Sequence, residues 1–242
     1  MEGIGPPLVT PFDEEGAVDH DRLRNLVGWV ERRDVDFLVP CGSTSEGELL
    51  TDEERASVIE TVADEASVPV LAGTGHPGLR ATLETTAAAA EAGANGALVV
   101  TPHYYNHDQE TLGAYYRELA DESPLPVYLY SVPVFADARI EPETAGELST
   151  HPNVAGMKDS SGDLSAFART VDRVGEDFAM LVGTGALVAQ ALDAGASGGI
   201  AALANLYPER LAAVVDAHPD DPALAREQNR RLVEVDTAIT SE

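Results

Sequence analysis

Apolar runs alternate with amphipathic segments along the whole chain. The runs are apolar throughout rather than alternately apolar and polar, which is the pattern expected for parallel strands that are covered on both faces. Between them, apolar residues recur every three or four positions, which predicts helices. The eight predicted strands lie at residues 4–12, 35–41, 68–74, 97–102, 127–132, 154–158, 178–183 and 199–204.

Several predicted helix boundaries carry residues that favour helix ends. The stretch 51–54, Thr-Asp-Glu-Glu, is a capping box, and Pro142 and Pro208 stand where a proline is tolerated in a first turn. Gly93 and Gly195 follow alanine-rich stretches, at the point where a left-handed residue ends many helices. The predicted helices that follow the strands lie at residues 19–32, 52–65, 79–92, 109–120, 142–148, 164–174, 186–194 and 208–216.

Eight strand and helix units in 242 residues predict an α/β fold of the (β/α)8 TIM-barrel type. An open doubly wound sheet is the competing architecture, but no Gly-x-Gly-x-x-Gly follows the first strand to indicate a dinucleotide site. No linker divides the chain. We expect residues 1–216 to form the barrel and residues 217–242 to form a shortened C-terminal helical segment with one helix at 223–239.

The chain is strongly acidic. Asp and Glu outnumber Lys and Arg by 42 to 15, which gives a formal net charge of −27. This charge disfavours nucleic acids and anionic membranes as partners. It also predicts adaptation to high salt, where the Debye length falls to about 3 Å at 1 M. We therefore expect stability to rise steeply with KCl concentration.

No targeting segment, membrane anchor or metal cluster is expected. The N-terminal residues lack the basic and then apolar pattern of a secretory signal, and no apolar run reaches about 18 residues. Cys41 is the only cysteine, so an intramolecular disulfide and a Cys-based zinc cluster are excluded. A cytoplasmic protein without a metal ion is the expectation.

Lys158 is the only lysine of the chain, and the other fourteen basic side chains are arginines. Guanidinium stays protonated at any working pH, whereas an amine in an apolar setting can lose its proton and attack a carbonyl. A Schiff-base enzyme is therefore the leading hypothesis. The plainer alternative is that Lys158 is an ordinary surface residue.

Other reactive side chains follow the predicted strands. In a barrel, the residues that carry chemistry gather just past the carboxyl ends of the strands. The stretch 41–46, Cys-Gly-Ser-Thr-Ser-Glu, follows the second strand, Tyr104 follows the fourth, and Tyr130 lies near the end of the fifth. Each has a plainer reading, since the loop also fits a helix cap and a tyrosine is more often packed than catalytic. With Lys158, they predict one site.

At these residues the chain resembles the dihydrodipicolinate synthase/N-acetylneuraminate lyase family of class I pyruvate-dependent aldolases. The resemblance runs from about Pro7 to Leu206, with the motifs in the family's order. The motifs are Gly-Ser-Thr-x-Glu, Ala-Gly-Thr-Gly, Thr-Pro-x-Tyr-Tyr, Tyr-x-Val-Pro, Met-Lys-Asp-Ser-Ser-Gly-Asp and Gly-Gly-Ile-x-Ala-x-Ala-Asn, at residues 42–46, 72–75, 101–105, 130–133, 157–163 and 198–205.

The resemblance implies four catalytic residues. Lys158 corresponds to the Schiff-base lysine, and Tyr130 to the phenol that shuttles protons during imine formation and assists C–C cleavage. Ser43 takes the place of a hydroxyl that relays protons between two tyrosines. Tyr104 corresponds to the second tyrosine, which in the family usually reaches in from a neighbouring subunit.

The resemblance also implies how the substrates are held. Thr44, in the loop that begins at Gly42, would bind the substrate carboxylate partly through backbone N–H groups, and Ile200 would line the pyruvate pocket. The expected partners are pyruvate and a small aldehyde or keto-acid substrate. No cofactor is expected, and a homo-oligomer, either a dimer or a tetramer, is expected although the shortened C-terminal segment puts the family's usual tetramer in question.

Departures from the family pattern bear on the reaction. Phe135 stands where dihydrodipicolinate synthases have an arginine that binds the incoming carboxylate, Arg139 is displaced by four residues, and Ser45 replaces a glycine. We therefore expect a lyase that cleaves 2-keto-3-deoxygluconate or its 6-phosphate to pyruvate and an aldehyde. The alternatives are 4-hydroxy-tetrahydrodipicolinate (dihydrodipicolinate) synthase, which condenses pyruvate with aspartate semialdehyde, and 4-hydroxy-2-oxoglutarate aldolase.

Two hypotheses from other classes stay open. A metal-dependent barrel enzyme would use His76, His103, Glu46 and Asp159, although their spacing matches no tight ligand motif. A non-catalytic homologue would keep the barrel and bind pyruvate without turnover, because a fold does not guarantee a function.

Overall fold

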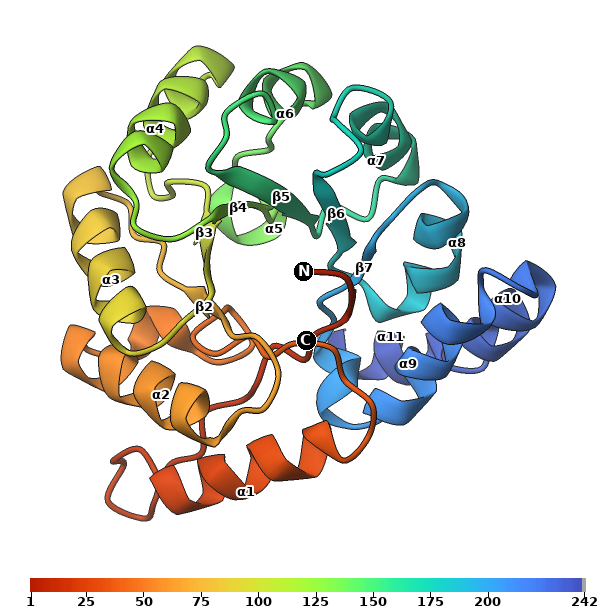
Figure 1. The fold of residues 1–242 in the computed structure, drawn as a ribbon, viewed down its shortest axis with the longest axis horizontal. Helices are drawn as coiled ribbons and strands as arrows, with labels where there is room; N and C mark the ends of the chain where they lie inside the picture. Colours follow the sequence, from red (N-terminus) through yellow and green to blue (C-terminus); the bar gives the residue numbers. More distant parts are fainter. Residues whose placement is uncertain (241–242) are drawn as a thin grey trace.

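A curled sheet of seven parallel strands forms the centre of the protein, and the helices surround it (Figure 1). The structure is a computed structural model that describes residues 1–240. The strand order is β1-β7-β6-β5-β4-β3-β2, so the first two strands form the two edges. The strands are β1 (Gly3–Ile4), β2 (Leu71–Gly73), β3 (Gly96–Val100), β4 (Val127–Ser131), β5 (Val154–Asp159), β6 (Ala179–Val182) and β7 (Gly198–Gly199).

Residues 36–40 lie between the two edge strands, where the sequence predicts the second strand. The Leu38 amide donates to the Pro69 carbonyl at 2.9 Å, and the Val39 amide donates to the Pro6 carbonyl at 3.1 Å. Only isolated bridges form here, because Pro6 and Pro69 have no N–H with which to complete a ladder. The barrel prediction is thus confirmed in part, as a TIM-barrel-like α/β fold with seven regular strands and one hydrogen-bonded segment.

The helices alternate with the strands as the periodicity predicts. The capping box at Thr51 is present, Pro142 and Pro208 occupy first turns, and Gly93 and Gly195 have φ of 95° and 98°. The helices are α1 (His20–Glu31), α2 (Asp52–Glu65), α3 (Leu79–Glu91), α4 (Gln109–Glu122), α5 (Pro133–Ala136), α6 (Pro142–Leu148), α7 (Leu164–Val171), α8 (Val188–Asp193), α9 (Pro208–Ala217), α10 (Pro222–Arg230) and α11 (Val233–Thr240), with 3₁₀ turns η1 (Gly47–Leu49), η2 (Gly185–Leu187) and η3 (Ala202–Asn205).

The predictions of the first and last strands were too long. Strand β1 stops after two residues, and the prolines that follow it cannot donate to a ladder. Strand β7 contains Gly198 at φ 152°, where a Cβ would collide with the Gly3 carbonyl. The chain then turns into η3, so of the predicted strand 199–204 only Gly199 lies in β7, and the Ile200 amide adds one hydrogen bond to the Val182 carbonyl at 2.9 Å.

The prediction of one C-terminal helix at 223–239 was wrong, because the chain turns between α10 and α11. The buried Asn229 side chain donates to the Gly185 carbonyl at 2.8 Å and accepts from the Ala189 amide at 2.8 Å. After the turn, Asp236 accepts from the Ala186 amide at 3.0 Å. Both helices are thereby fastened to the segment after β6. Whether residues 217–242 count as a separate unit stays a prediction, and residues 241–242 lie outside the described part.

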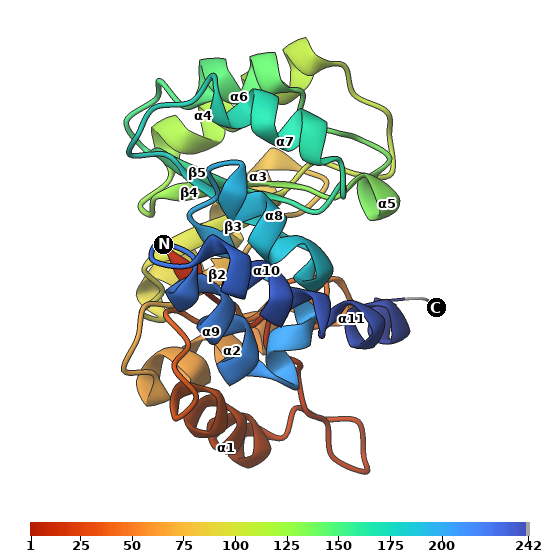
Figure 2. The same cartoon turned by 90° about the vertical axis from the view of Figure 1, so that its right-hand side faces the viewer.

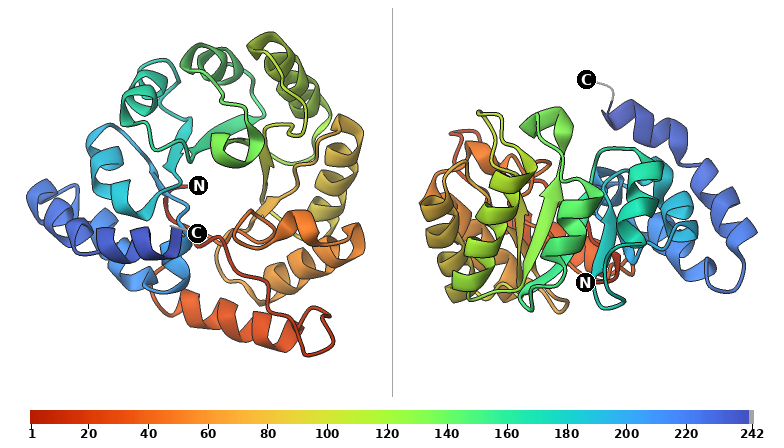
Figure 3. Two further views of the ribbon diagram at one scale, coloured as in Figure 1. Left: turned by 180° about the vertical axis from the view of Figure 1, so that it is seen from behind. Right: turned by 90° about the horizontal axis from the view of Figure 1, so that it is seen from above.

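Two hydrophobic clusters hold the strands in place. The larger one fills the space between the strands and the surrounding helices. The smaller one lies inside the curled sheet and includes Phe37, Leu71, Leu98, Tyr130 and Ile200. Helices α5 and α11 lie at the end of the molecule opposite the N-terminus, and strand β4 leads directly into α5 (Figures 2 and 3). This end therefore carries the carboxyl ends of the strands. Within residues 1–240, no helix combines the length and the apolar character needed to cross a bilayer.

Candidate active site

Lys158 and Tyr130 are register partners on the neighbouring strands β5 and β4. The Lys158 Nζ atom lies 4.2 Å from the centroid of the Tyr130 ring. The two residues are only 4% and 5% exposed. Parallel pairing therefore brings the only amine side chain against a phenol at the carboxyl end of the sheet, in an apolar setting that excludes water.

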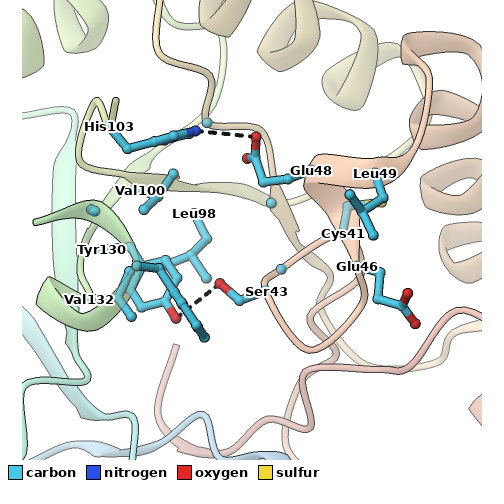
Figure 4. Close-up of a pocket in the computed structure, with 15 residues that line it drawn as sticks. Cys41, Ser43, Glu46, Glu48, Leu49, Leu98, Val100, His103, Tyr130 and Val132 are labelled. Carbon is cyan, nitrogen blue, oxygen red and sulfur yellow. Dashed lines mark hydrogen bonds and ion pairs between the residues drawn. The ribbon is translucent and has the colours of Figure 1, made fainter. Parts of the chain in front are cut away.

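The Tyr130 phenol is tuned by two opposing effects. Burial raises its pKa, but the positive charge of Lys158 and hydrogen bonds with Ser43, Ser160 and Lys158 lower it, and the net pKa lies below the usual value of 10.0. The Tyr130 hydroxyl lies 3.4 Å from the Ser43 Oγ atom (Figure 4). A phenol with a lowered pKa, in reach of an amine and a hydroxyl, can donate a proton and recover it.

The loop after residue 41 presents two free amides. The buried Ser45 hydroxyl accepts from the Gly42 amide at 3.1 Å, and the Thr10 hydroxyl donates to the Ser45 carbonyl at 2.7 Å. Within the described residues, the amides of Ser43 and Thr44 donate to no acceptor. Successive amides of this kind can bind a carboxylate. The serine that replaces the family's glycine thus ties the loop back on itself.

A cavity of about 320 Å³ opens beside this loop, lined by fifteen residues (Figure 4). Of the residues predicted for the site, Gly42, Ser43 and Tyr130 line it. Lys158 is not a lining residue but packs against the ring of Tyr130, which is one. Ile200 is fully buried in the same inner cluster as Tyr130. Most of the remaining wall is apolar.

Tyr104 lies away from the other predicted residues. It is 85% exposed, has a left-handed backbone with φ of 80°, and contacts the Tyr105 ring edge-on at 4.9 Å between centroids. It is not one of the residues that line the cavity. Within this chain, Tyr104 and Tyr130 are therefore not joined through Ser43.

The sequence analysis missed a polar network at the other end of the cavity. Arg55 is 1% exposed and donates from Nε to the Gly47 carbonyl at 2.7 Å. Its Nη2 atom lies 3.2 Å from Glu48 Oε1, and Glu48 Oε2 lies 3.6 Å from His103 Nε2. Both Glu48 and His103 line the cavity. One sequence signal for this network was available. Arg55 is a charged residue on the apolar face of α2, which it shares with Val58 and other buried apolar residues.

The four residues of the metal hypothesis do not converge. His76 Nε2 lies 3.1 Å from Arg55 Nη1 and 2.9 Å from Thr85 Oγ1, and burial, helped by the Arg55 charge, lowers its pKa. Asp159, whose pKa is raised by burial, accepts from the Ser161 amide at the end of β5. In the part of the chain that the structure describes, no three His, Cys, Asp or Glu residues are grouped so that they could hold a metal ion.

Comparisons with known proteins identify the family. The model of the dihydrodipicolinate synthetase family matches residues 1–242. A 4-hydroxy-tetrahydrodipicolinate synthase from Haloarcula marismortui is 39% identical over 90% of this chain and 72% of its own. Dihydrodipicolinate synthase from Aquifex aeolicus superposes with a TM-score of 0.96 at 31% identity, covering 100% of this chain and 84% of its own.

A further solved relative is named for a different reaction. The 2-keto-3-deoxygluconate aldolase from Picrophilus torridus superposes with a TM-score of 0.94 at 27% identity, covering 100% of this chain and 88% of its own. The family model, the relatives and the fold agree on one assignment. The chain belongs to the dihydrodipicolinate synthetase family of class I pyruvate aldolases, and it has halophilic relatives.

Proposed function

We propose that the protein joins pyruvate reversibly to an aldehyde through a Schiff base on Lys158. The amine attacks the pyruvate carbonyl carbon, water leaves, and an imine forms. Loss of a methyl proton gives an enamine, whose carbon attacks the aldehyde, and hydrolysis returns the free amine. The observation that carries this proposal is the buried Lys158 amine 4.2 Å from the Tyr130 ring, with Ser43 at the phenol.

The neighbouring residues have distinct roles in this proposal. Tyr130 gives a proton to the departing hydroxyl during imine formation and takes it back during hydrolysis, with the Ser43 hydroxyl as the next member of the relay. The free amides of Ser43 and Thr44 bind the pyruvate carboxylate, supported by Gly42, while Ile200 packs against the methyl side. No metal or cofactor is needed for these steps.

The names of the relatives support aspartate semialdehyde as the aldehyde. Eight curated relatives, 34% to 39% identical, are all 4-hydroxy-tetrahydrodipicolinate synthases. They therefore back the synthase reaction better than the sugar-acid cleavage that the sequence analysis placed first. Cleavage of a 2-keto-3-deoxy acid remains the second candidate, because no lysine or arginine lines the cavity and Phe135 stands on its wall.

We further propose that the active protein is an oligomer. Tyr104 is exposed in the single chain, as expected for a side chain that completes the relay of a neighbouring subunit. We also infer that residues 36–40 close the sheet into a (β/α)8 barrel as its eighth strand position, since they are hydrogen-bonded to the segments on both sides.

Trapping of the imine tests the proposed chemistry. The protein is incubated with pyruvate and sodium borohydride in concentrated KCl, and the modified peptide is located by mass spectrometry. We expect one reduced adduct, on Lys158, and none in Lys158→Arg. A folded protein without an adduct would point instead to a non-catalytic homologue.

A further inference from the structure

The polar end of the cavity is built from residues that the Schiff-base chemistry does not use. Figure 4 shows the His103–Glu48 contact at one side of the cavity and the Tyr130–Ser43 contact at the other. Leu98 and Val100 lie between them in this view and give the intervening wall an apolar surface. The two contacts therefore face different parts of whatever occupies the cavity.

Glu48 is held in place from behind. The buried Arg55 guanidinium pairs with one of its carboxylate oxygens at 3.2 Å, and also donates to the carbonyls of Gly47 at 2.7 Å and Gly75 at 3.2 Å. These bonds tie Arg55 to the loops after the second predicted strand and after β2. The other carboxylate oxygen of Glu48 lies 3.6 Å from the His103 Nε2 atom.

Besides the Tyr130 phenol and the buried Cys41 thiol, the ionisable groups of the cavity wall are two carboxylates and one imidazole. Glu46 and Glu48 line the cavity together with His103, and none of the fifteen lining residues is a lysine or an arginine. The Arg55 guanidinium is already paired with Glu48, and Arg139, which does not line the cavity, is paired with Asp163 at 3.1 Å. A carboxylate or phosphate at this end would face like charges without a free cation.

We propose that His103, oriented by Glu48 and through it by Arg55, is the specificity-determining residue for the aldehyde, and that the cavity selects an uncharged hydroxyaldehyde. Glu48 occupies the Nε2 side of the ring, and Nδ1 has no hydrogen-bond partner among the described residues. The free nitrogen can bond to a substrate hydroxyl, which gives a polar contact without requiring a charge. This inference rests on the proposed pyruvate chemistry and selects its second candidate reaction.

A set of four aldehydes tests the inference after imine formation has been established. Glyceraldehyde is uncharged and carries hydroxyls, glyceraldehyde 3-phosphate has the same skeleton with an anionic end, propanal lacks hydroxyls, and aspartate semialdehyde carries a carboxylate and an ammonium. Condensation with pyruvate is followed in the wild type, in His103→Phe and in Glu46→Gln. The last variant changes a lining carboxylate that makes no hydrogen bond or ion pair in the structure, so it controls for cavity charge alone.

At the lowest KCl concentration that keeps the protein folded, we expect kcat/KM for glyceraldehyde to exceed that for both anion-bearing aldehydes by about tenfold, and we expect the difference to shrink as KCl is raised. In His103→Phe, kcat/KM for glyceraldehyde is expected to fall about tenfold, mainly through KM, while propanal changes less than about twofold, because only the former loses a hydrogen bond. Glu46→Gln is expected to leave glyceraldehyde within about twofold.

Each result bears on one of the two claims. A wild-type preference for aspartate semialdehyde or the phosphate, or equal loss for glyceraldehyde and propanal in His103→Phe, overturns the inference while the pyruvate imine still forms. Absence of the imine from folded wild type overturns the proposed function itself, and the inference with it. Circular dichroism in the same KCl buffer establishes that each variant is folded.

Discussion

The two ends of the cavity are built in different ways. At the chemical end, Lys158 and Tyr130 stand side by side on neighbouring strands, and their separation follows from the register of the sheet. At the polar end, Glu48 and His103 stand on two loops, and a buried arginine fixes one of them. The first end depends on the register of two neighbouring strands, and the second on ion pairs between loops. We therefore expect the reaction to be set at one end and the choice of aldehyde at the other.

Replacement of the amine should give the largest effect. Lys158→Arg keeps a positive charge beside Tyr130 but removes the nucleophile, because guanidinium does not lose its proton at working pH. We expect kcat to fall by about 10⁴-fold or more, with either aldehyde class. Steady-state condensation rates provide the measurement. Residual turnover within a hundredfold of wild type would assign the imine to another group.

Loss of the phenol should come next. Tyr130→Phe removes the proton donor, and kcat is expected to fall by roughly 10²- to 10⁴-fold. The wild-type pKa of Tyr130 is below its usual value, so the protonated phenol is depleted as pH rises through that lowered pKa. The wild-type rate should therefore decline on the alkaline side at a lower pH than for an ordinary tyrosine. This alkaline decline should be absent from the pH profile of Tyr130→Phe. If the decline persists in that variant, a group other than Tyr130 causes it.

Most of the architecture and the chemical end could be predicted from the sequence, because both leave local signals. Buried parallel strands give continuous apolar runs, and a lone lysine at a strand end indicates a reactive amine. The outer strands were overestimated because apolar composition does not report whether a residue can donate to a ladder, as Pro6 shows. The turn after α10 was missed because Asn229 is fixed by contacts with residues about forty positions earlier.

The polar end could not be predicted, because it is a product of long-range contacts. The sequence analysis considered His103 only as a metal ligand and did not consider Arg55, and only the fold brings these two residues and Glu48 together. Tyr104 is the opposite example. Its motif predicts a residue of the site, but in the single chain its side chain is exposed. Local signals thus identify residue types, while the convergence of side chains at one site depends on partners that are distant in the sequence.

Removal of the buried arginine should separate stability from chemistry. In Arg55→Met, the carbonyls of Gly47 and Gly75 lose a donor and Glu48 loses its partner. We expect the free energy of unfolding to fall by roughly 2–3 kcal/mol, measured by urea denaturation in KCl. Arg24→Met is the matched control, because its ion pair with Asp21 is exposed and contributes about 0.5 kcal/mol or less. Imine trapping in the folded variant should remain on Lys158, and equal losses in the two variants would contradict a special role for Arg55.

A cation introduced at the cavity wall should produce the smallest effect and the sharpest test of what separates the two ends. Phe135 lines the cavity and is 70% exposed, so an arginine can occupy this position without being buried. Phe135→Arg is expected to raise kcat/KM for glyceraldehyde 3-phosphate relative to glyceraldehyde by about tenfold at most, because solvent and salt screen an exposed charge. Phe135→Met is the uncharged control and should leave the ratio unchanged. If charge alone selects the aldehyde, the ratio of the two kcat/KM values in Phe135→Arg should fall again as KCl is raised. A ratio that changes neither with the arginine nor with the salt would mean that the shape of the cavity, and not its charge, governs the choice.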